Sequence, residues 1–438
     1  MKYYKTNQIT NLFIFFAFCF FTNCSKKGTN PTPVDNTPKV TITSLSVTTA
    51  TYNTVVVIKG TGFSNTVAND LVFFNGKAAM VTAAASTQLT VTVPLSAGTG
   101  KVSVKIDGGT EVTGPVFTYQ QSWVVSTFAG SGAKGYKDGS GTIAEFNFPT
   151  GLAFDGAGNL FVSEEGNDDV RKITQDGVVS TIAGNRIQGS DNGNGASASF
   201  WNPTGLAVDK TGNIFVTDYA NNLIRKIDPL NNVTTFAGQR AIGFNNGQGT
   251  AASFAGPTDI KIDASGSLYV SDFTNEAIRK ITTDGVVSTF ASIKLPIGSN
   301  IFNFPFGITF DKDNNLYATT YSFKVQKITS GGVVSVFAGS GIRGTDDGAA
   351  GSASFYEMFS LASDKNGNIY VTDSNLIRKI TPSGQVTTLA GIETTVGSTD
   401  GSASIATFNH PIGIAIDKSG NIFVADTQNN LIRKIAFE

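Results

Sequence analysis

One phrase of the sequence occurs six times between residues 149 and 438, and this repetition limits the possible folds more than any other feature. Its first copy begins Pro149-Thr-Gly-Leu-Ala-Phe-Asp-Gly-Ala-Gly-Asn-Leu-Phe-Val-Ser-Glu164. The first aspartate of the phrase recurs every 48 to 54 residues, at Asp155, Asp209, Asp263, Asp311, Asp364 and Asp417. A period near 50 residues that carries several short strands is typical of a propeller blade.

The ends of the repeat array predict how the ring closes. A complete repeat contains four strand-like runs, which in the second copy are residues 204–208, 214–217, 223–227 and 233–236. The sixth repeat ends without its fourth run, whereas an isolated run at 124–130 precedes the first repeat. Pairing these two segments would complete a sixth blade and remove the open sheet edges. The repeats resemble NHL repeats throughout residues 122–438, which implies a six-bladed NHL-type β-propeller.

A separate module is expected over residues 38–120. Short runs with alternating apolar residues are separated there by turn residues, as in a small β-sandwich. The segments Gly60-Thr-Gly-Phe63, Val72-Phe-Phe-Asn-Gly76 and Phe117-Thr-Tyr119 resemble the IPT/TIG family of immunoglobulin-like domains. That resemblance implies a spacer or a protein-contact element. The expected fold class is therefore all-β, with a small immunoglobulin-like β-sandwich followed by a six-bladed β-propeller.

The first residues predict export. Lys2 and Lys5 precede an apolar run at 12–21, which is long enough for a signal-peptide core and too short to span a bilayer as a helix. Cys24 follows this run and resembles the lipobox cysteine of bacterial lipoproteins, which is acylated after cleavage. We therefore expect a lipoprotein signal peptide at 1–23, a flexible tether at 24–37 and a lipid anchor at Cys24 in the cell envelope, at the outer membrane. An ordinary secretory signal with an incidental cysteine is the alternative.

Composition excludes several classes of site. Cys19 and Cys24 are the only cysteines and His410 is the only histidine, so a cysteine nucleophile in the propeller and a multi-histidine zinc site are excluded. The net charge of −1 argues against a nucleic-acid partner. No phosphate-binding loop or dinucleotide fingerprint is present. We accordingly expect no cofactor.

Two repeated features are expected to be structural. The Asp-x-x-Gly-Asn step, as in Asp209 to Asn213, has the residues of a tight turn between strands, although it also looks like a metal loop. The second feature is an acid that ends the second strand and an arginine on the third strand, as in Asp218 and Arg225.

Five repeats carry this acid and this arginine, and the fourth has lost both. It has Thr320 and Gln326 instead, and joint loss suggests that the two side chains meet as a charge-assisted pair. A ring of acids that binds a cation is the alternative. The five expected pairs are Glu164–Arg171, Asp218–Arg225, Asp272–Arg279, Asp373–Arg378 and Asp426–Arg433.

The candidate ligand site is a slot of two residues that varies between repeats. The slot follows a recurring phenylalanine, expected to pack between blades, and precedes the first strand near the axis. Its residues change chemistry from blade to blade, which favours a recognition surface, with incidental surface variation as the alternative. The fourth repeat also has a shorter crossing segment, which would leave a notch. Together with Asp259, which replaces a glycine of other repeats, the expected ligand-binding residues are Phe148, Trp201, Asn202, Asp259, Phe304, Tyr356, Glu357 and His410.

The sequence favours a binding protein over an enzyme. Aromatic side chains at a channel mouth suit stacking against sugar rings and also suit protein contacts. The expected partner is therefore a glycan or an envelope protein. The alternative is a metal-dependent hydrolase or lyase of the propeller type, with a calcium-like site in the axial channel that uses Asp259 and Glu357.

Overall fold

The structure is a computed structural model that describes residues 39–292 and 303–438. Within these ranges the regular elements are β-strands, accompanied by short 3-10 helices of three residues each, which confirms the all-β prediction. The predictions for the signal peptide at 1–23, the tether at 24–37 and Cys24 fall outside the described residues, as does Phe302, the recurring phenylalanine of the fourth repeat. No helix among the described residues is long and apolar enough to cross a membrane.

The first module is one continuous sheet of eight strands, in the order β1-β3-β6-β5-β4-β7-β8-β2. Its long strand β5 pairs with β4 through Lys77 to Ala79 and with β6 through Met80 to Ala85, so the sheet folds over itself. The strands are β1 (Thr41–Leu45), β2 (Thr49–Ala50), β3 (Val55–Thr61), β4 (Asp70–Phe74), β5 (Lys77–Ala85), β6 (Gln88–Thr92), β7 (Gly100–Ile106) and β8 (Val112–Tyr119).

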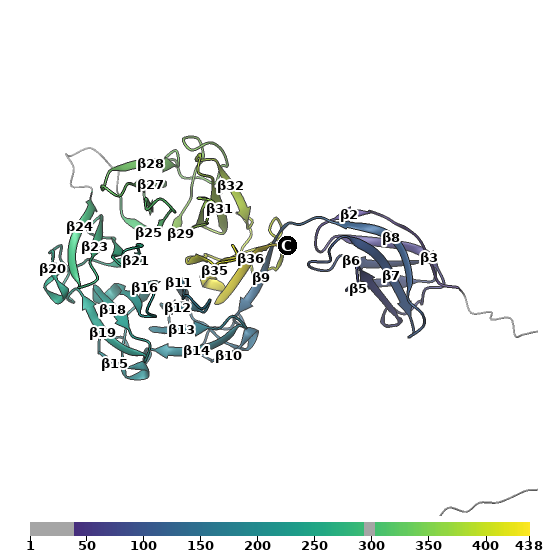
Figure 1. The fold of residues 1–438 in the computed structure, drawn as a ribbon, viewed down its shortest axis with the longest axis horizontal. Helices are drawn as coiled ribbons and strands as arrows, with labels where there is room; N and C mark the ends of the chain where they lie inside the picture. Colours follow the sequence, from purple (N-terminus) through teal and green to yellow (C-terminus); the bar gives the residue numbers. More distant parts are fainter. Residues whose placement is uncertain (1–38, 293–302) are drawn as a thin grey trace, which may run out of the picture. The chain divides into compact units, whose positions relative to one another are not determined.

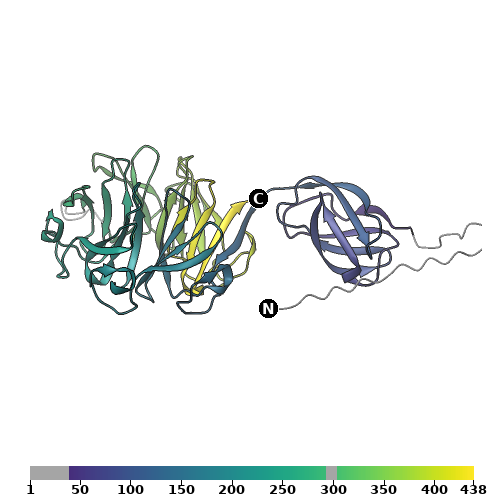
Figure 2. The ribbon, with the colours of Figure 1, turned by 60° about the horizontal axis from the view of Figure 1, so that its bottom comes forward.

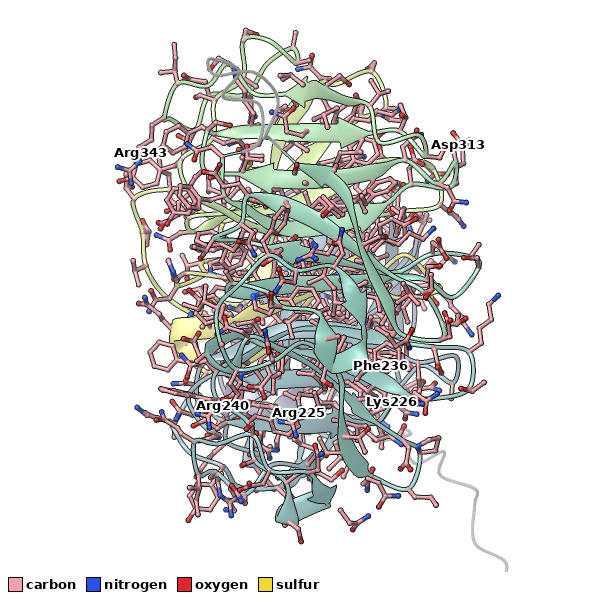
Figure 3. The ribbon with its side chains drawn as sticks, turned by 90° about the vertical axis from the view of Figure 1, so that its left-hand side faces the viewer. Arg225, Lys226, Phe236, Arg240, Asp313 and Arg343 are labelled. Carbon is pink, nitrogen blue, oxygen red and sulfur yellow. The ribbon has the colours of Figure 1, made fainter. Side chains whose placement is uncertain are left out.

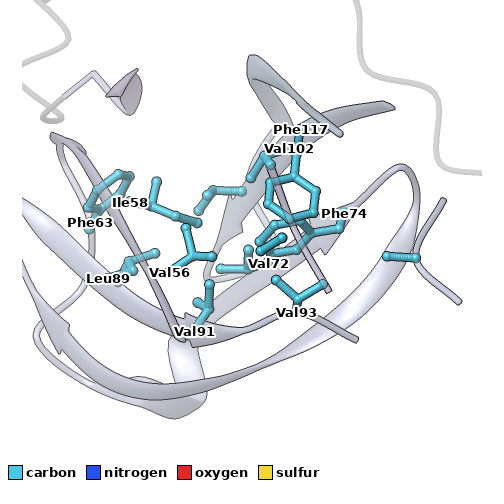
Figure 4. Close-up of a cluster of buried hydrophobic side chains, with 13 residues drawn as sticks. Val56, Ile58, Phe63, Val72, Phe74, Leu89, Val91, Val93, Val102 and Phe117 are labelled. Carbon is cyan, nitrogen blue, oxygen red and sulfur yellow. The ribbon is translucent and has the colours of Figure 1, made fainter. Parts of the chain in front are cut away.

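The two halves of this sheet enclose an aliphatic and aromatic core (Figure 4). Alternation along β3 turns Val56 and Ile58 inward, where they are completely buried, while Val55 faces solvent. Phe74 and Phe117 meet edge to face, with ring centroids 4.8 Å apart. Each such buried side chain stabilises the module by about 1.5–3 kcal/mol relative to an exposed one.

The remaining strands form six sheets arranged in a ring (Figure 1). In the first blade, β11 (Pro149–Phe154) lies nearest the axis and is followed outward by β12 (Leu160–Glu164), β13 (Asp169–Ile173) and β14 (Val178–Ala183). The two-residue strand β10 (Gly139–Ser140), from the segment that precedes the blade, covers the outer edge of β14. All pairs are antiparallel.

The next four blades follow the same plan. In the second and third, the inner-to-outer strands are β16 (Pro203–Val208), β17 (Ile214–Asp218), β18 (Leu223–Ile227) and β19 (Asn232–Ala237), then β21 (Pro257–Ile262), β22 (Leu268–Asp272), β23 (Ala277–Ile281) and β24 (Val286–Ser292), with edge strands β15 (Gly193–Asn194) and β20 (Gly247–Gln248). In the fourth and fifth they are β25 (Pro305–Phe310), β26 (Leu316–Thr320), β27 (Lys324–Ile328) and β28 (Val334–Ala338), then β29 (Met358–Ser363), β30 (Ile369–Asp373), β31 (Leu376–Ile380) and β32 (Val386–Ala390).

The sixth blade closes the ring as the sequence predicts. Its order is β33 (Gly401–Ser402), β9 (Trp123–Ala129), β36 (Leu431–Phe437), β35 (Ile422–Asp426) and β34 (Ile414–Ile416). Strand β9 thus supplies the fourth strand of the last blade, with Trp123 opposite Phe437 and Ala129 opposite Ile432. This confirms that the isolated strand before the first repeat completes the ring.

The propeller has two opposite faces. Figure 2 shows the ring tilted relative to Figure 1. We call the face on which the crossing segments reach the inner strands the loop face, and the opposite one the turn face. Figure 3 shows Arg240 and Arg343, which belong to crossing segments, on one side of the ring and Asp313, which follows an inner strand, on the other.

The Asp-x-x-Gly-Asn step is a turn on the turn face. Asp209 Oδ1 accepts hydrogen bonds from the amides of Thr211 and Asn213, at 2.8 and 2.9 Å. Its Oδ2 accepts one from the Asn213 side chain at 2.7 Å. Gly212 has φ +86, a backbone conformation that glycine adopts without strain. The prediction of a turn is confirmed.

Candidate functional site

The five predicted acid–arginine pairs all form, and both side chains of each are completely buried. Each arginine donates from Nη1 to the acid of the neighbouring strand, and Asp218 and Arg225 meet at 2.9 Å. The other four distances are 2.6 Å for Glu164–Arg171, 2.8 Å for Asp272–Arg279, 2.9 Å for Asp373–Arg378 and 2.8 Å for Asp426–Arg433. The pairs lie between strands two and three of their blades, so the prediction of structural pairing is confirmed.

Each arginine also binds the crossing segment that covers its blade. Arg225 Nη2 donates to the Asn192 side chain at 3.0 Å and to the Asp191 carbonyl at 3.0 Å. The residues that correspond to Asn192 are Asp138, Asn246, Asp347 and Asp400, each hydrogen-bonded to the arginine of its blade. Each of these residues precedes a glycine, and such Asp-Gly and Asn-Gly steps would by themselves suggest only a turn.

The recurring phenylalanine completes this cluster. Phe200 is fully buried, and the Arg225 guanidinium lies over its ring at 5.1 Å from the centroid. Phe146, Phe254, Phe355 and Phe408 are buried against the corresponding arginines in the same way. The acid, the arginine and the phenylalanine therefore hold each crossing segment, and the slot that follows it, in a fixed position.

The buried acids also fix the slot directly. Asp218 Oδ1 accepts a hydrogen bond of 2.8 Å from the amide of Trp201, the first slot residue of the second blade. Asp373 does the same for Tyr356 at 2.8 Å. Burial raises the pKa of Asp218 to about 6, although the positive charge of Arg225 favours its ionised form. The slot is thus built on a rigid, hydrogen-bonded base.

The second slot residue has a left-handed backbone in five of the six blades. Asn202 (φ 54) and Gly256 (φ 63) tolerate this conformation, whereas Phe148 (φ 53), Phe304 (φ 49) and His410 (φ 53) are bulky and adopt it at a cost. Such residues persist where their surroundings hold them, and they concentrate at binding sites. The strain therefore supports the slot as a place where side chains are displayed.

A pocket of about 210 Å³ opens on the loop face between the fourth and fifth blades. It contains Tyr356 and Glu357, two of the predicted site residues, and the irregular part of the fourth blade forms its opposite wall. Its lining is Thr320, Tyr321, Phe323, Arg343, Tyr356, Glu357, Met358 and Phe359. Tyr321 is 57 % exposed and Tyr356 is 37 % exposed, so a ligand can reach part of each ring, although Arg343 covers one face of Tyr356.

An array of aromatic rings extends from this pocket across the loop face. Phe359, in the pocket wall, contacts His410 at 4.7 Å and Phe306 at 5.4 Å between ring centroids. Phe306 leads to Phe273 at 6.1 Å, and Phe273 contacts Phe304 at 5.2 Å. This array brings two predicted residues, Phe304 and His410, next to the pocket. Phe273 and Phe359 were not predicted as site residues. Phe273 follows the second strand of its blade and Phe359 lies in the inner strand, so neither belongs to the variable slot.

The other predicted slot residues lie in the first two blades. Phe148 is 39 % exposed, and Lys134 Nζ lies 5.7 Å from its ring centroid. Trp201 is half-buried, and the Asn202 side chain donates to Glu165 at 3.2 Å. None of these residues lines the pocket between the fourth and fifth blades. The structure therefore divides the predicted ring into a pocket side and a separate side.

Asp259 lines a small axial cavity of about 40 Å³ together with Ser360. Its side chain is buried, and Oδ1 accepts from Lys261 Nζ at 2.6 Å and from the Ile260 amide at 2.8 Å. Oδ2 accepts from the Ile308 amide at 2.9 Å. Asp259 and Glu357 thus line different hollows, and no group of three or more His, Cys, Asp or Glu side chains within residues 39–292 and 303–438 could hold a metal ion.

His410 is the only histidine of the sequence, and its ring packs against Phe359. Burial, with Phe359 against its ring, lowers the pKa of His410 below its usual value of 6.5, while the negative charge of Glu357 opposes this shift. A neutral imidazole can donate one hydrogen bond and accept another.

Both predicted modules match known protein families. Residues 40–119 match the IPT/TIG domain family, and residues 200–227 and 408–435 match the NHL repeat family. The chain therefore contains a TIG domain and NHL repeats, and the repeats build a six-bladed propeller.

Curated relatives match about 70% of the chain. The chain is 28% identical over 321 residues to Protein SUPPRESSOR OF QUENCHING 1, chloroplastic, of Arabidopsis thaliana, covering 70% of this chain and 26% of that protein. It is 29% identical over 324 residues to NHL repeat-containing protein 2 of Gallus gallus, covering 69% and 40%. The chain thus spans about a quarter to two fifths of the length of these relatives.

A solved structure matches both modules. An auxiliary nutrient binding protein from Bacteroides thetaiotaomicron superimposes with a TM-score of 0.67 and 20% identity, covering 91% of this chain and 98% of that one. At this identity the likeness shows the fold.

Proposed function

We propose that this chain is an exported, lipid-anchored binding protein of the cell envelope, and that its propeller binds a glycan on the loop face. The observation that carries the proposal is the pocket between the fourth and fifth blades. Two partly exposed tyrosines, Tyr321 and Tyr356, rim it, and Arg343 and Glu357 add a donor and an acceptor. Aromatic rings with a few convergent polar groups are what a sugar-binding pocket requires.

The construction of the slot supports binding at a preformed surface. The buried acid–arginine pair in each regular blade holds the slot before a ligand arrives. Hydrogen bonds from slot amides to Asp218 and Asp373 add to this support. A preorganised site loses less conformational entropy when it binds. The likeness to an auxiliary nutrient binding protein is consistent with a binding role, since that protein has the same fold over 91% of this chain.

The location in the cell envelope rests on the first residues. The short apolar run at 12–21 and Cys24 directly after it favour export and acylation. The membrane is then a partner only through the lipid anchor. A protein ligand is the other partner that the aromatic surface would suit.

A binding screen tests the proposal. A fragment of residues 38–438 is presented to arrays of glycans and of peptides, and hits are measured again with Tyr321→Ala and Tyr356→Ala. We expect a glycan whose affinity falls in both variants. Binding to peptides alone would replace the glycan with a protein ligand. Hits that ignore both substitutions would move the site away from this pocket.

A further inference from the structure

Arg343 of the pocket between the fourth and fifth blades, and Lys324 beside its wall, have no carboxylate partner among the described residues. Arg343 lines the pocket and Lys324 follows Phe323 of its wall. Within residues 39–292 and 303–438, no carboxylate lies within ion-pair distance of either side chain. The segment 293–302, which precedes the fourth blade, contains no Asp or Glu in its sequence.

Lys324 is a specific departure from the repeat. It is the first residue of β27, and four other blades have a buried apolar residue at this position, namely Leu223, Ala277, Leu376 and Leu431. Lys324 is half-buried, and a Cβ placed on Gly341 would lie 3.2 Å from its Nζ. Its stem thus occupies the place of the apolar residue, while its ammonium group reaches the crossing segment two residues before Arg343.

Arg343 is held in place without losing its donors. Its guanidinium lies over the Tyr356 ring, 3.8 Å from the centroid. Stacking on an aromatic face orients a guanidinium and leaves its N–H groups free at the edge, where they match a carboxylate in a bidentate geometry. Figure 3 shows Arg343 at the outside of the loop face, where a ligand can reach it.

We infer that the ligand of this pocket is an anionic glycan, a saccharide that carries a carboxylate such as a uronic acid. Arg343 binds the carboxylate, with Lys324 adding a second positive charge, and the rings of Tyr321 and Tyr356 contact the sugar. Glu357 accepts hydrogen bonds from sugar hydroxyls and repels the carboxylate, so it sets the direction in which the saccharide lies. This inference rests on the proposed glycan-binding role of the same pocket and names the chemistry of its ligand.

The test compares matched saccharides on the full chain. Isothermal titration calorimetry measures an oligogalacturonate of six residues against the same oligosaccharide with its carboxyl groups reduced to alcohols. We expect the uronate to bind at least about tenfold more tightly at low salt, an advantage that shrinks as ionic strength rises. Arg343→Gln should weaken uronate binding by about tenfold or more, and Arg343→Lys should recover only part of it because a lysine cannot bind in a bidentate way.

Two further variants make the test specific. Lys324→Leu introduces the residue found at this position in three other blades, so it should fold normally and still weaken uronate binding. Lys365→Gln removes an exposed charge from the turn face of the fifth blade and should leave binding unchanged. Melting temperatures show whether each variant is folded.

The outcomes separate the two proposals. Equal binding of the charged and reduced saccharides, with no effect of Arg343→Gln, would overturn the anionic ligand and leave the glycan-binding role intact. If a sulfated oligosaccharide without uronate bound more strongly than the uronate, the inference that the ligand carries a carboxylate would be overturned. Binding of neither saccharide would also overturn the inference, and failure of every glycan in the wider screen would then overturn the glycan-binding role itself.

Discussion

Arg225 donates a hydrogen bond of 2.9 Å to the carboxylate of Asp218, and both side chains are completely buried inside the second blade. The same arginine reaches Asn192 in the crossing segment, and the same carboxylate accepts the amide of Trp201. One buried pair therefore links two strands, a crossing segment and a slot residue. The consequences of removing it can be measured.

Asp218→Ala should destabilise the propeller by about 3–5 kcal/mol, because it leaves Arg225 charged, buried and without its main partner. Urea unfolding measures this change. The double variant with Arg225→Ala should cost less than the sum of the two single variants, since the second substitution removes the unpaired charge. Additive costs would contradict the pairing. Asp218→Thr with Arg225→Gln is a matched control, because it reproduces the residues of the fourth blade.

Ring closure should depend on β9. A fragment that begins at residue 121 retains the strand that pairs with β36, whereas a fragment that begins at residue 135 lacks it. The shorter fragment should aggregate or melt at a much lower temperature, because an edge of the last blade is exposed. Thermal unfolding followed by circular dichroism compares the two. Equal melting temperatures would contradict closure through β9.

Lipidation should require Cys24. Cys24→Ser should abolish labelling by a fatty-acid analogue and release the protein from the membrane fraction, because no other cysteine follows the apolar run. Cys19→Ser, which lies within that run, is the control and should leave labelling unchanged. Labelling of the Cys24→Ser variant at the normal level would contradict the anchor.

Tyr356 should dominate recognition among the slot aromatics. Tyr356→Ala should weaken ligand binding by about tenfold or more, since aromatic anchors supply much of the energy of recognition, whereas Trp201→Ala, which lies outside the pocket, should leave binding nearly unchanged. Folding should change little, because Tyr356 is 37 % exposed and Trp201 is half-buried. Affinity and melting temperature are measured together. Normal binding by Tyr356→Ala would place the site elsewhere, and weakened binding by Trp201→Ala would place it at the first two blades.

His410 should remain neutral below the pH at which a free histidine becomes charged. Because the folded-state pKa lies below 6.5, the unfolded chain binds more protons between the two values. The resulting contribution to stability is present above pH 6.5 and is lost as the pH falls through the folded-state pKa. His410 is the only histidine, so its imidazole signal in NMR reports this pKa directly.

A substitution checks the cause of this shift. Phe359→Ala should raise the pKa of His410 toward 6.5, because it exposes the ring to water. Phe273→Ala should not, because the rings of Phe306 and Phe359 stand between Phe273 and His410. A His410 pKa at or above 6.5 in the unaltered protein would contradict the prediction.

Contacts that recur from blade to blade could be predicted from the sequence, because equivalent positions in the six repeats can be compared with one another. The pairing of Asp218 with Arg225 followed from the joint absence of both residues in the fourth blade, and closure followed from a missing strand and an isolated one. The same reasoning could have found Asn192 and its equivalents. An Asp-Gly or Asn-Gly step accompanies every blade that has the arginine, and residues 293–302 contain none.

Contacts that do not recur from blade to blade could not be predicted from the sequence. Phe306 and Phe359 share one repeat position, the second residue of the inner strand, whereas Phe273 follows the second strand of the third blade, so the repeat pattern does not predict that these rings meet. Asp259 was predicted to bind a ligand because it replaces a glycine. Its carboxylate oxygens instead accept hydrogen bonds from the Lys261 side chain and from two backbone amides. The left-handed backbone at Phe148 and His410 depends on neighbouring blades, since their amides donate to Asn430 and Asn375.

Closure of the ring by β9 has a consequence for the order of folding. The contacts at the seam join distant parts of the chain, and Asn430 donates to the carbonyl of Gly132 across 298 residues. The strand that is synthesised first in the propeller must therefore wait, unpaired, until the last strand emerges. Contacts between such distant residues form slowly, because a long loop must close before they add stability. Closure of the ring through β9 and β36 is therefore expected to be the last step in the folding of the propeller.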